Sequence, residues 1–426
     1  MNEWYRLYSN ILHLHFSTGY YQLPESAKNT ISPTNPLKRF LKVAGYTVVR
    51  LFGNLLQRVE QPTKLQGAVW LYVVSQNNYD SLQLVQEGIP DAVFVAGQNK
   101  EIGRYNSTVK RLSLRRKVFY YYKFLPLYFR FLKQKPHTTL RFYDILYDAV
   151  GFYEVYRRKL RKYKPAAIVF ANDHNADARA MLLAANSLGI KTIYIQHASV
   201  SPIFPPLHFG LSLLEGQDSL DKYKMCGPVQ GHVELIGMPK ADAFVHFRNQ
   251  HNTIRTVGLG CNQLDDMAVI AQTLRQLTRD FPGISFILRP HPRDTRNFTS
   301  LQAISPQISL SLAAQEQTFA YLRKLDMQIS GTSGIHLEAV LLNVWSVYYN
   351  FSTTQALHDY YGFITHGLVD SAADYAALAH LLQQHQQQKP DVYLRAQYYN
   401  ATIGTPDEGH SSELAARLIK NFIVPH

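Results

Sequence analysis

The sequence predicts an α/β protein with two domains, each built on a parallel sheet, and a cleft between them. Three observations support this fold class. Short apolar runs such as 68–74 and 166–170 alternate with longer helical patterns, as in βαβ units. Several runs end in polar or glycine-rich clusters, as strands do at the ligand-binding edge of an open sheet. The pattern stops in the polar stretch 246–255 and then restarts, so we expect domains at 1–245 and 246–426.

Composition agrees with two globular domains. The chain has 426 residues, 46% of them hydrophobic, which is enough for two separate cores. No apolar run is long enough to span a bilayer, and the N-terminal stretch lacks the pattern of a secretory signal. Only Cys226 and Cys261 occur, which argues against a disulfide framework and against a structural zinc site. We therefore expect a cytoplasmic protein without a metal or another cofactor.

In the first domain, residues 1–60 have helical spacing interrupted by prolines, with 40–56 as one helix. Further on we predict helices at 79–88, 142–163 and 176–188, and strands at 68–74, 92–96, 166–170, 191–195, 210–214 and 234–237. Pro126 is expected to break or kink any helix in its surroundings.

The ends of three predicted strands in the first domain carry groups suited to proton transfer. Asp173 and His174 follow 166–170, His197 follows 191–195, and Glu215 follows 210–214. Because neighbouring parallel strands end at the same edge, these side chains are candidates for general acid–base chemistry. Asp173 is the preferred catalytic carboxylate, as base or as nucleophile. The alternatives are that Asp173 caps the next helix and that Glu215 is an ordinary loop carboxylate.

The second domain repeats the alternation of strands and helices. Strands are predicted at 256–260, 284–288, 308–310, 327–329 and 344–349, and helices at 265–280, 314–325, 335–342, 374–386 and 411–422. The short motif Gly258-Leu259-Gly260 resembles half of a dinucleotide fingerprint, but the third glycine is absent. There is also no Walker A, Gly-x-Ser-x-Gly or His-Glu-x-x-His pattern.

Two strand ends in the second domain predict a phosphate site. Arg289, His291, Pro292 and Arg293 accompany the end of 284–288, while Ser330, Thr332, Ser333 and Gly334 follow 327–329. Backbone N–H groups, hydroxyls and cations at such a position bind anions. Glu338, early in the following helix, is placed to accept hydrogen bonds from ribose hydroxyls. The alternative is a tight strand–helix connection without a ligand, and His208 and His336 are expected to be structural.

Charge is strongly uneven along the chain. Residues 1–165 hold 26 Lys and Arg against 10 Asp and Glu, whereas the rest hold 18 against 21. Much of the excess lies in 110–135, where aromatic residues alternate with basic ones that include Arg115, Arg116, Lys117, Lys123 and Arg130. This pattern is typical of an anionic membrane surface. The main alternative is a core segment with a basic edge, and single-stranded nucleic acid is a weaker one without a supporting fold motif.

Four motifs together carry a family resemblance. The order of Gln196-His197, the stretch 237–242, Arg289-Pro290-His291-Pro292 and the 330–334 cluster resembles bacterial glycosyltransferases of the GT-B fold. Within these, it is most similar to enzymes with cytidine-activated donors: CDP-glycerol glycerophosphotransferases, CMP-Kdo transferases and bacterial sialyltransferases. The resemblance covers about 166–349 and implies two Rossmann-like lobes with an interdomain cleft and a C-terminal helix.

The resemblance also implies residue roles. His291 and Pro292 match the His-Pro motif of the donor site, Ser330, Thr332 and Ser333 match the phosphate-binding cluster, and His197 matches a proposed acid/base. Ala198-Ser199-Val200 after His197 departs from the glycerophosphotransferase pattern, and Glu215-Gly216 lies later in the chain than the acidic-Gly motif of sialyltransferases.

The leading hypothesis is a glycosyltransferase on the inner face of the bacterial membrane. It would move a sugar, such as Kdo or a related acidic sugar, from a CMP- or CDP-activated donor to a capsule, lipopolysaccharide or related surface glycan. The retained alternatives are a nucleotide-sugar 2-epimerase and a non-catalytic scaffold that binds membrane or polysaccharide.

Overall fold

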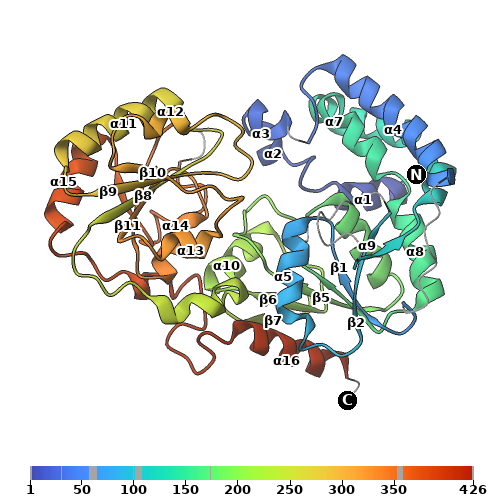
Figure 1. Ribbon diagram of the computed structural model, residues 1–426. Helices are drawn as coiled ribbons and strands as arrows, with labels where there is room; N and C mark the ends of the chain where they lie inside the picture. The colour runs from blue at the N-terminus through green and yellow to red at the C-terminus, as the bar shows by residue number, and fades with distance from the viewer. Residues whose placement is uncertain are drawn as a thin grey trace. The chain divides into compact units, whose positions relative to one another are not determined.

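The computed structural model describes residues 2–29, 31–56, 65–98, 100, 108–172, 174–352 and 358–424. It divides into two compact units, which we call unit 1 (Met1–Ile236 with Ser412–His426) and unit 2 (Gly237–Ser411). Both units have the α/β architecture that the sequence predicts (Figure 1). The expected boundary at 245/246 is nine residues too late, and the expected assignment of the C-terminal helix to the second domain is wrong.

Unit 1 is built on a parallel sheet that has seven strands in the described part of the chain, in the order β3-β2-β1-β4-β5-β6-β7. Each pair has parallel register, for example Val69 with Ala167 and Trp70 with Ile168. The strands are β1 (Val69–Tyr72), β2 (Ala92–Gly97), β3 (Lys110–Leu112), β4 (Ala167–Phe170), β5 (Lys191–Ile195), β6 (Leu211–Leu214) and β7 (His232–Leu235). Strand β3 was not predicted, because the charged residues of this short strand hide the apolar pattern.

The sheet of unit 1 is covered on both faces. Trp70 and Tyr72 of β1 belong to one apolar core, while Val69 and Leu71 belong to a second core, because successive side chains of a strand point to opposite faces. The helices of unit 1 are α1 (Asn2–Ile11), α2 (Thr18–Gln22), α3 (Glu25–Asn29), α4 (Pro36–Leu56), α5 (Gln76–Gln86), the 3₁₀ helix η2 (Arg115–Lys123), α6 (Phe124–Gln134), α7 (Pro136–Ala149), α8 (Phe152–Tyr163), α9 (Ala176–Asn186), α10 (Gln217–Cys226) and α16 (Ser411–Ile423).

Helix α16 closes unit 1 although it is the last helix of the chain. Ala415 and Ile419 are fully buried in the core that also contains β1. Lys191 Nζ, at the start of β5, donates hydrogen bonds of 2.9 Å to the carbonyls of Phe422 and Ile423. The chain therefore leaves unit 1 after Ile236 and returns to it at Ser412.

The helical region between β3 and β4 differs from its prediction in two places. Pro126 does not break a helix, because it lies in the first turn of α6, where a missing N–H costs no internal hydrogen bond. The expected single helix 142–163 is two helices, α7 and α8, separated at Gly151, whose φ of 87° is left-handed. A Cβ at Gly151 would also lie 3.0 Å from the carbonyl of Lys117.

Unit 2 has its own parallel sheet, with six strands in the described residues, in the order β10-β9-β8-β11-β12-β13. The strands are β8 (Thr256–Cys261), β9 (Ser285–Pro290), β10 (Ile308–Leu310), β11 (Met327–Ser330), β12 (Trp345–Tyr349) and β13 (Asp370–Ala372). The helical elements are η3 (Pro239–Phe247), α11 (Met267–Asp280), α12 (Thr299–Gln302), α13 (Thr318–Leu322), α14 (Ile335–Leu341), α15 (Tyr375–His385) and η4 (Tyr393–Ala396). Strand β13 was not predicted, and α13 is shorter than the predicted helix 314–325.

The stretch predicted to link the domains packs inside unit 2, at the amino ends of its strands. Asp326, which precedes β11, accepts hydrogen bonds from the side chains of Asn249 and His251 and from the backbone N–H groups of Arg255 and Thr256, at 2.8 to 3.0 Å. These bonds hold the pKa of Asp326 below its usual value against the effect of burial. The polar composition of 248–255 therefore reflects a bonded loop and not a free linker.

Candidate functional site

Three loops meet at the carboxyl edge of the unit 2 sheet, and they form the candidate site. They follow β8, β9 and β11, which are neighbours in the sheet. Arg296, in the loop after β9, donates hydrogen bonds of 2.6 and 2.7 Å to the carbonyls of Asp265 and Asn262 in the loop after β8. Asn262 Nδ2 lies 3.3 Å from the carbonyl of Thr332 in the loop after β11. The three loops are thus tied into one surface.

His291, Pro292 and Arg293 are exposed on this surface, as a ligand site requires. The backbone N–H of His291 donates to the carbonyl of Cys261 at 2.8 Å, which fixes the start of the loop against β8. His291 Nδ1 accepts a hydrogen bond of 3.2 Å from the N–H of Arg293. Desolvation by neighbouring atoms and then the positive charge of Arg293 lower the pKa of His291. The imidazole is therefore neutral at pH 7.

The loop after β11 is fixed from below by a buried histidine. His336, 1% exposed, lies between Ser346 Oγ at 2.7 Å and the carbonyl of Gly331 at 2.9 Å. Since a carbonyl only accepts, Nε2 carries the proton and Nδ1 accepts from Ser346. Burial lowers the pKa of His336 to about 4, so the ring stays neutral. The expectation that His336 is structural agrees with this position.

The predicted phosphate cluster separates into buried and accessible members. Ser330 is buried, and its hydroxyl donates to the carbonyl of Gly260 at 2.8 Å, so it ties β11 to β8. Thr332, Ser333 and Gly334 are partly exposed in the loop itself. Ser333 Oγ lies 3.4 Å from the N–H of Ile335, at the start of α14. The accessible part of the cluster is therefore 332–334.

Arg289 has a different position from the one expected. Its guanidinium is buried, donating to Ser311 Oγ at 2.7 Å and to the carbonyl of Glu316 at 2.9 Å, and it lies 4.9 Å from the ring centre of Tyr321. These contacts hold the end of β9 against the following loops. The structure thus favours a structural role for Arg289 and not contact with a ligand.

Glu338 is partly buried and forms an ion pair with Lys240 of η3. The prediction that Glu338 binds ribose hydroxyls did not include an ion pair with Lys240. Lys240 stands in the stretch 237–242 that carried the family resemblance, so its motif was visible in the sequence while its partner was not.

Asp265 is a group at this edge that the sequence analysis did not select. It is 4% exposed, and a Cβ placed on Gly331 would lie 3.3 Å from its Oδ1, so it adjoins the loop after β11. Burial raises the pKa of Asp265 to about 6, although the N–H of Asn262 and the charge of Arg296 act in the opposite direction. The strand-end rule used for the other loops, applied to the end of β8, would have found it.

The Gly258-Leu259-Gly260 motif has a packing explanation. A Cβ on Gly258 would lie 2.2 Å from the hydroxyl of Tyr321 and 2.6 Å from Gln328 Oε1. A Cβ on Gly260 would lie 2.9 Å from Gln328 Nε2. The glycines of β8 therefore make room for side chains from α13 and β11, and this requirement accounts for the resemblance to half of a dinucleotide fingerprint.

In unit 1, polar side chains also gather at the carboxyl edge of the sheet. Asn78, in the first turn of α5, donates to the carbonyl of Ala171 at 3.2 Å, and the same Nδ2 lies 3.4 Å from His197 Nε2. The ends of β1, β4 and β5 are joined in this way. Asn78 is fully buried and was not selected from the sequence, where it stands in the run Ser75-Gln76-Asn77-Asn78 after a strand.

Glu215 is buried beside Gln196. Gln196 Nε2 donates to Glu215 Oε2 at 3.2 Å, and the N–H of Glu215 donates to Gln196 Oε1 at 2.9 Å. This reciprocal pair joins the ends of β5 and β6. With 3% of its surface exposed, Glu215 is less suited to a catalytic role than the partly exposed His197 next to its partner.

Asp173, the preferred catalytic carboxylate, lies outside the described residues, so its role stays a prediction. The residue that caps α9 is Asn175, whose Oδ1 accepts from the N–H of Asp177 at 3.0 Å. His174 stacks on Phe204 with ring centres 4.4 Å apart. Burial, followed by the charge of His174, lowers the pKa of the nearby His15 to about 4. No sequence pattern marked His15, which precedes α2.

The basic aromatic segment also differs from its prediction. Lys117 is 1% exposed, donates to the carbonyl of Asp148, and lies 3.3 Å from the ring centre of Phe152. Lys123 is buried in an ion pair of 2.5 Å with Glu154. The prediction that these two lysines contact a membrane is therefore wrong. Arg116 is exposed, and Arg115 and Arg130 are partly exposed.

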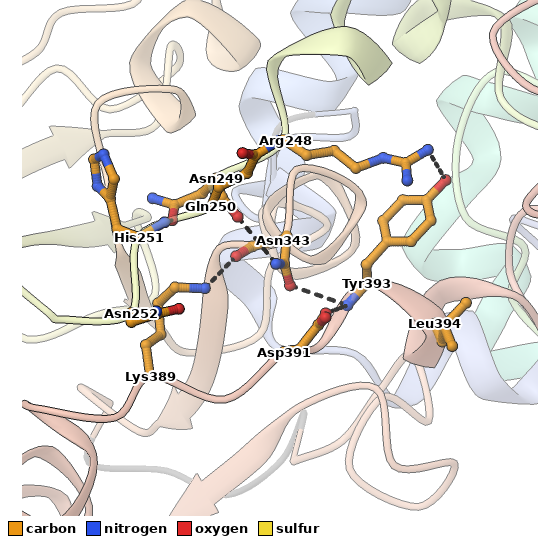
Figure 2. A pocket seen from close by; sticks show the side chains of 10 residues that line it. All are labelled: Arg248, Asn249, Gln250, His251, Asn252, Asn343, Lys389, Asp391, Tyr393 and Leu394. Carbon is orange, nitrogen blue, oxygen red and sulfur yellow. Dashed lines mark hydrogen bonds between the residues drawn. The ribbon is translucent and has the colours of Figure 1, made fainter.

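Unit 2 also has a pocket of about 330 Å³, on the edge of the sheet opposite to the candidate site. Figure 2 shows the side chains that line it. It is lined by Arg248, Asn249, Gln250, His251, Asn252, Asn343, Lys389, Asp391, Tyr393 and Leu394. Asn343 Nδ2 donates to the carbonyl of Asn249, its Oδ1 accepts from the N–H of Val392, and its carbonyl accepts from Lys389 Nζ. These bonds join the loops at the amino ends of the strands, which is a structural function.

No family model matches the sequence, and no curated protein sequence matches it. Solved structures do match. The UDP-GlcNAc 2-epimerase from Neisseria meningitidis bound to UDP-GlcNAc has 11% identity and a TM-score of 0.52, covering 83% of this chain and 100% of that one. The calicheamicin glycosyltransferase CalG4 has 12% identity and a TM-score of 0.52, covering 84% and 98%. The glycosyltransferase of kitacinnamycin has 13% identity and a TM-score of 0.51, covering 84% and 100%. The chain thus has the GT-B fold of two Rossmann-like units.

Proposed function

We propose that the protein is a glycosyltransferase that takes a sugar from a nucleotide-activated donor. The observation that carries the proposal is the surface of three joined loops at the carboxyl edge of the unit 2 sheet, where a GT-B fold has room for a nucleotide. His291 and Arg293 on one loop and Thr332, Ser333 and Gly334 on another are accessible there. They offer the donors and the positive charge that a departing phosphate needs.

In the proposed reaction, a hydroxyl of the acceptor attacks the anomeric carbon of the donor sugar. The bond from that carbon to the phosphate oxygen breaks, and the nucleotide leaves with the electron pair. A base in unit 1 takes the proton of the hydroxyl. His197, partly exposed and held near Asn78, and the predicted carboxylate Asp173 are the groups proposed for this role, with His174 beside them.

Two electrostatic features support the donor site. The neutral His291 can donate a hydrogen bond to a phosphate oxygen through Nε2 while Nδ1 accepts from the N–H of Arg293. The ion pair of Lys240 with Glu338 supplies a cation and a carboxylate for phosphate and ribose. Arg289 and Ser330 are left out of the proposed donor contacts because both are engaged inside the unit.

The nucleotide is proposed to be a cytidine mono- or diphosphate, on the basis of the His-Pro motif at His291-Pro292 and the cluster at 330–334. The sugar is proposed to be Kdo or a related acidic sugar, and the acceptor a capsule, lipopolysaccharide or related glycan on the inner face of the bacterial membrane. These finer assignments rest on the sequence resemblance.

A thermal-shift and calorimetry panel of CMP, CDP, UDP, GDP and ADP tests the donor assignment. We expect CMP or CDP to bind most tightly, and His291→Ala to weaken that binding at least tenfold while the melting temperature stays within a few degrees. The matched control is His380→Ala, because His380 is exposed on α15 of the same unit. Unchanged affinity in His291→Ala, or equal loss in the control, would refute the assignment.

A nucleotide-sugar 2-epimerase is the second candidate, because the UDP-GlcNAc 2-epimerase of Neisseria meningitidis matches the fold with the same TM-score as CalG4. The two functions differ in their need for an acceptor. An epimerase inverts a carbon of the donor sugar with no acceptor present, which NMR of the donor would detect. A transferase leaves that carbon unchanged and releases the nucleotide only when a glycan is added.

A further inference from the structure

Helix α4 has an unusual distribution of polar and apolar side chains. Leu37, Phe40, Leu41, Val48 and Phe52 are each 54 to 64% exposed. At 100° per residue they fall within an arc of about 120°, so they form one stripe along the outer side of the helix.

Among the described residues of α4, three polar side chains face inward, together with the partly buried Val43. Arg39 is buried, Lys42 pairs with the buried Asp144 of α7 at 2.8 Å, and Thr47 Oγ1 lies 2.6 Å from the hydroxyl of Tyr147. A surface helix ordinarily buries its apolar side and exposes its polar side. In the described part of α4 the large apolar side chains named above face outward instead, and polar contacts join the helix to α7. Figure 1 shows α4 running along α7.

The adjoining segment η2–α6 carries a second exposed apolar row, although α6 also buries Leu127 and Phe131 in the core of unit 1. Phe119, Tyr122, Leu125 and Phe129 are 60 to 71% exposed, and their spacing of three, three and four residues places them in one row. On the inner side, Lys117 and Lys123 are buried and bonded to Asp148 and Glu154. Because α4 packs against η2, the two apolar stripes lie on neighbouring elements of unit 1.

The two elements that carry the stripes have charges of one sign. No Asp or Glu occurs between Glu25 and Glu60 or between Glu101 and Asp144, so both elements lack acidic residues entirely. The second stripe has an exposed cation at each end of its row, Arg116 before Phe119 and Lys133 after Phe129. Lys38 is exposed near the start of α4. The surface therefore combines exposed rings with positive charge and carries no negative charge of its own elements.

We infer that this surface binds an anionic lipid bilayer, with the two stripes in the interface and Arg116, Lys133 and Lys38 on lipid phosphates. The rings bury apolar area at headgroup depth, and the cations gain attraction to the anionic leaflet. Within the described residues no helix is long and apolar enough to span a membrane. The inference rests on the proposed function and deepens it, since it gives the membrane contact of the proposed transferase. Arg116, Lys133 and Lys38 take the place of Lys117 and Lys123 as the contacting cations.

A lipid surface fits these observations better than a protein partner. A protein interface needs a shaped surface with matched polar groups, whereas a bilayer accepts any apolar stripe flanked by cations. The length of the two stripes and the single sign of the charge are both what a broad anionic plane selects. A second copy of the chain would bring the same positive charge against itself, which opposes dimer formation through this face.

Vesicle cosedimentation of the full chain tests the inference. We expect binding to vesicles of phosphatidylcholine and phosphatidylglycerol at seven to three, and much weaker binding to phosphatidylcholine alone. Phe40→Ser with Phe52→Ser, and separately Phe119→Ser with Phe129→Ser, should each weaken binding about tenfold or more. Arg116→Gln with Lys133→Gln should weaken it by roughly tenfold.

The controls use other exposed positions of unit 1. Met225→Ser, at a side chain that is 72% exposed on α10, and Lys420→Gln, exposed on α16, should bind vesicles as the unaltered chain does. Wild-type binding to neither vesicle, or equal binding by the ring variants, would overturn the inference. So would self-association that the ring variants abolish without any binding to lipid. Nucleotide binding is measured on the same samples. Loss of nucleotide binding with lipid binding retained would refute the proposed transferase function alone.

Discussion

Replacing His336 by leucine removes the buried support of the loop at 331–334. The imidazole bridges Ser346 Oγ and the carbonyl of Gly331, and both partners would be left buried without it. Each unsatisfied group costs about 1 to 3 kcal/mol, and leucine restores most of the volume, so we expect unit 2 to lose about 3 to 4 kcal/mol of unfolding free energy. Nucleotide affinity should also fall, because the displaced carbonyl belongs to the loop of the candidate site.

The same histidine predicts a dependence on pH. Its pKa is about 4 in the folded chain and about 6.5 in the unfolded chain, so the unfolded chain binds the proton more tightly. The folded state therefore loses stability as the pH falls from about 6.5 to 4, by about 3 kcal/mol in total. Asp265 has the opposite sign, because its raised pKa of about 6 makes folding more favourable as the pH falls through that range. The difference between variant and wild type isolates His336.

Urea unfolding between pH 4 and 7.5, followed by tryptophan fluorescence, measures this difference. Trp345 on β12 is the tryptophan of unit 2, so a background with Trp4→Phe and Trp70→Phe reports unit 2 alone. The destabilisation by His336→Leu should be largest at pH 7 and should nearly vanish at pH 4. The exposed His380→Leu serves as control and should show neither effect. A loss that is the same at every pH would refute the assignment of a neutral, bridging imidazole.

Three further predictions follow from the contacts above. Asp265→Asn should raise the affinity for CMP or CDP several-fold at pH 7.5 and have little effect at pH 5. The reason is that the carboxylate beside Gly331 is ionised only above its pKa of about 6. Calorimetry at both pH values would contradict this if the affinity ratio of variant to wild type were the same at pH 5 and pH 7.5. Gly258→Ala should lower the unfolding free energy of unit 2 by roughly 2 to 4 kcal/mol, since the new Cβ would lie 2.2 Å from the hydroxyl of Tyr321. The control is Gly283→Ala, where a Cβ would have nothing within 4 Å, and it should leave the same denaturation curve unchanged. Asp177→Ala should destabilise unit 1 by about 2 to 4 kcal/mol, because the buried hydroxyls of Tyr72 and Tyr156 both donate to that carboxylate. The control is Asp80→Ala, at an exposed position. Equal melting curves for the two variants would disprove the stabilising role of Asp177.

The fold and the strand ends could be predicted because they depend on local patterns. Apolar runs that end in polar clusters located β4, β5, β9 and β11, and with them the edge at which the candidate residues lie. What could not be predicted were the partners of long side chains. Arg289 and Arg293 stand four residues apart at the same strand end, yet Arg289 is buried against Ser311 and Arg293 is exposed.

The basic residues of η2 illustrate the same limit. Lys117 and Arg116 are adjacent, and composition gives both the same expectation, but Lys117 points inward to Asp148 while Arg116 is exposed. Only the three-dimensional arrangement shows which cation meets solvent. The sequence did reveal the net charge and the aromatic content of the segment, which are the properties that a bilayer would recognise.

The return of α16 to unit 1 affects how the protein is made. A ribosome releases residues 1–236 long before 412–423, so the nascent unit 1 lacks one of the helices that cover one face of its sheet. Unit 2 is continuous in sequence and can therefore complete its fold while unit 1 still lacks α16. Messages truncated before Ser412 would thus release a folded second unit attached to an unfinished first one. Such products would expose the apolar surface around Leu211 and Ile193 to chaperones and proteases.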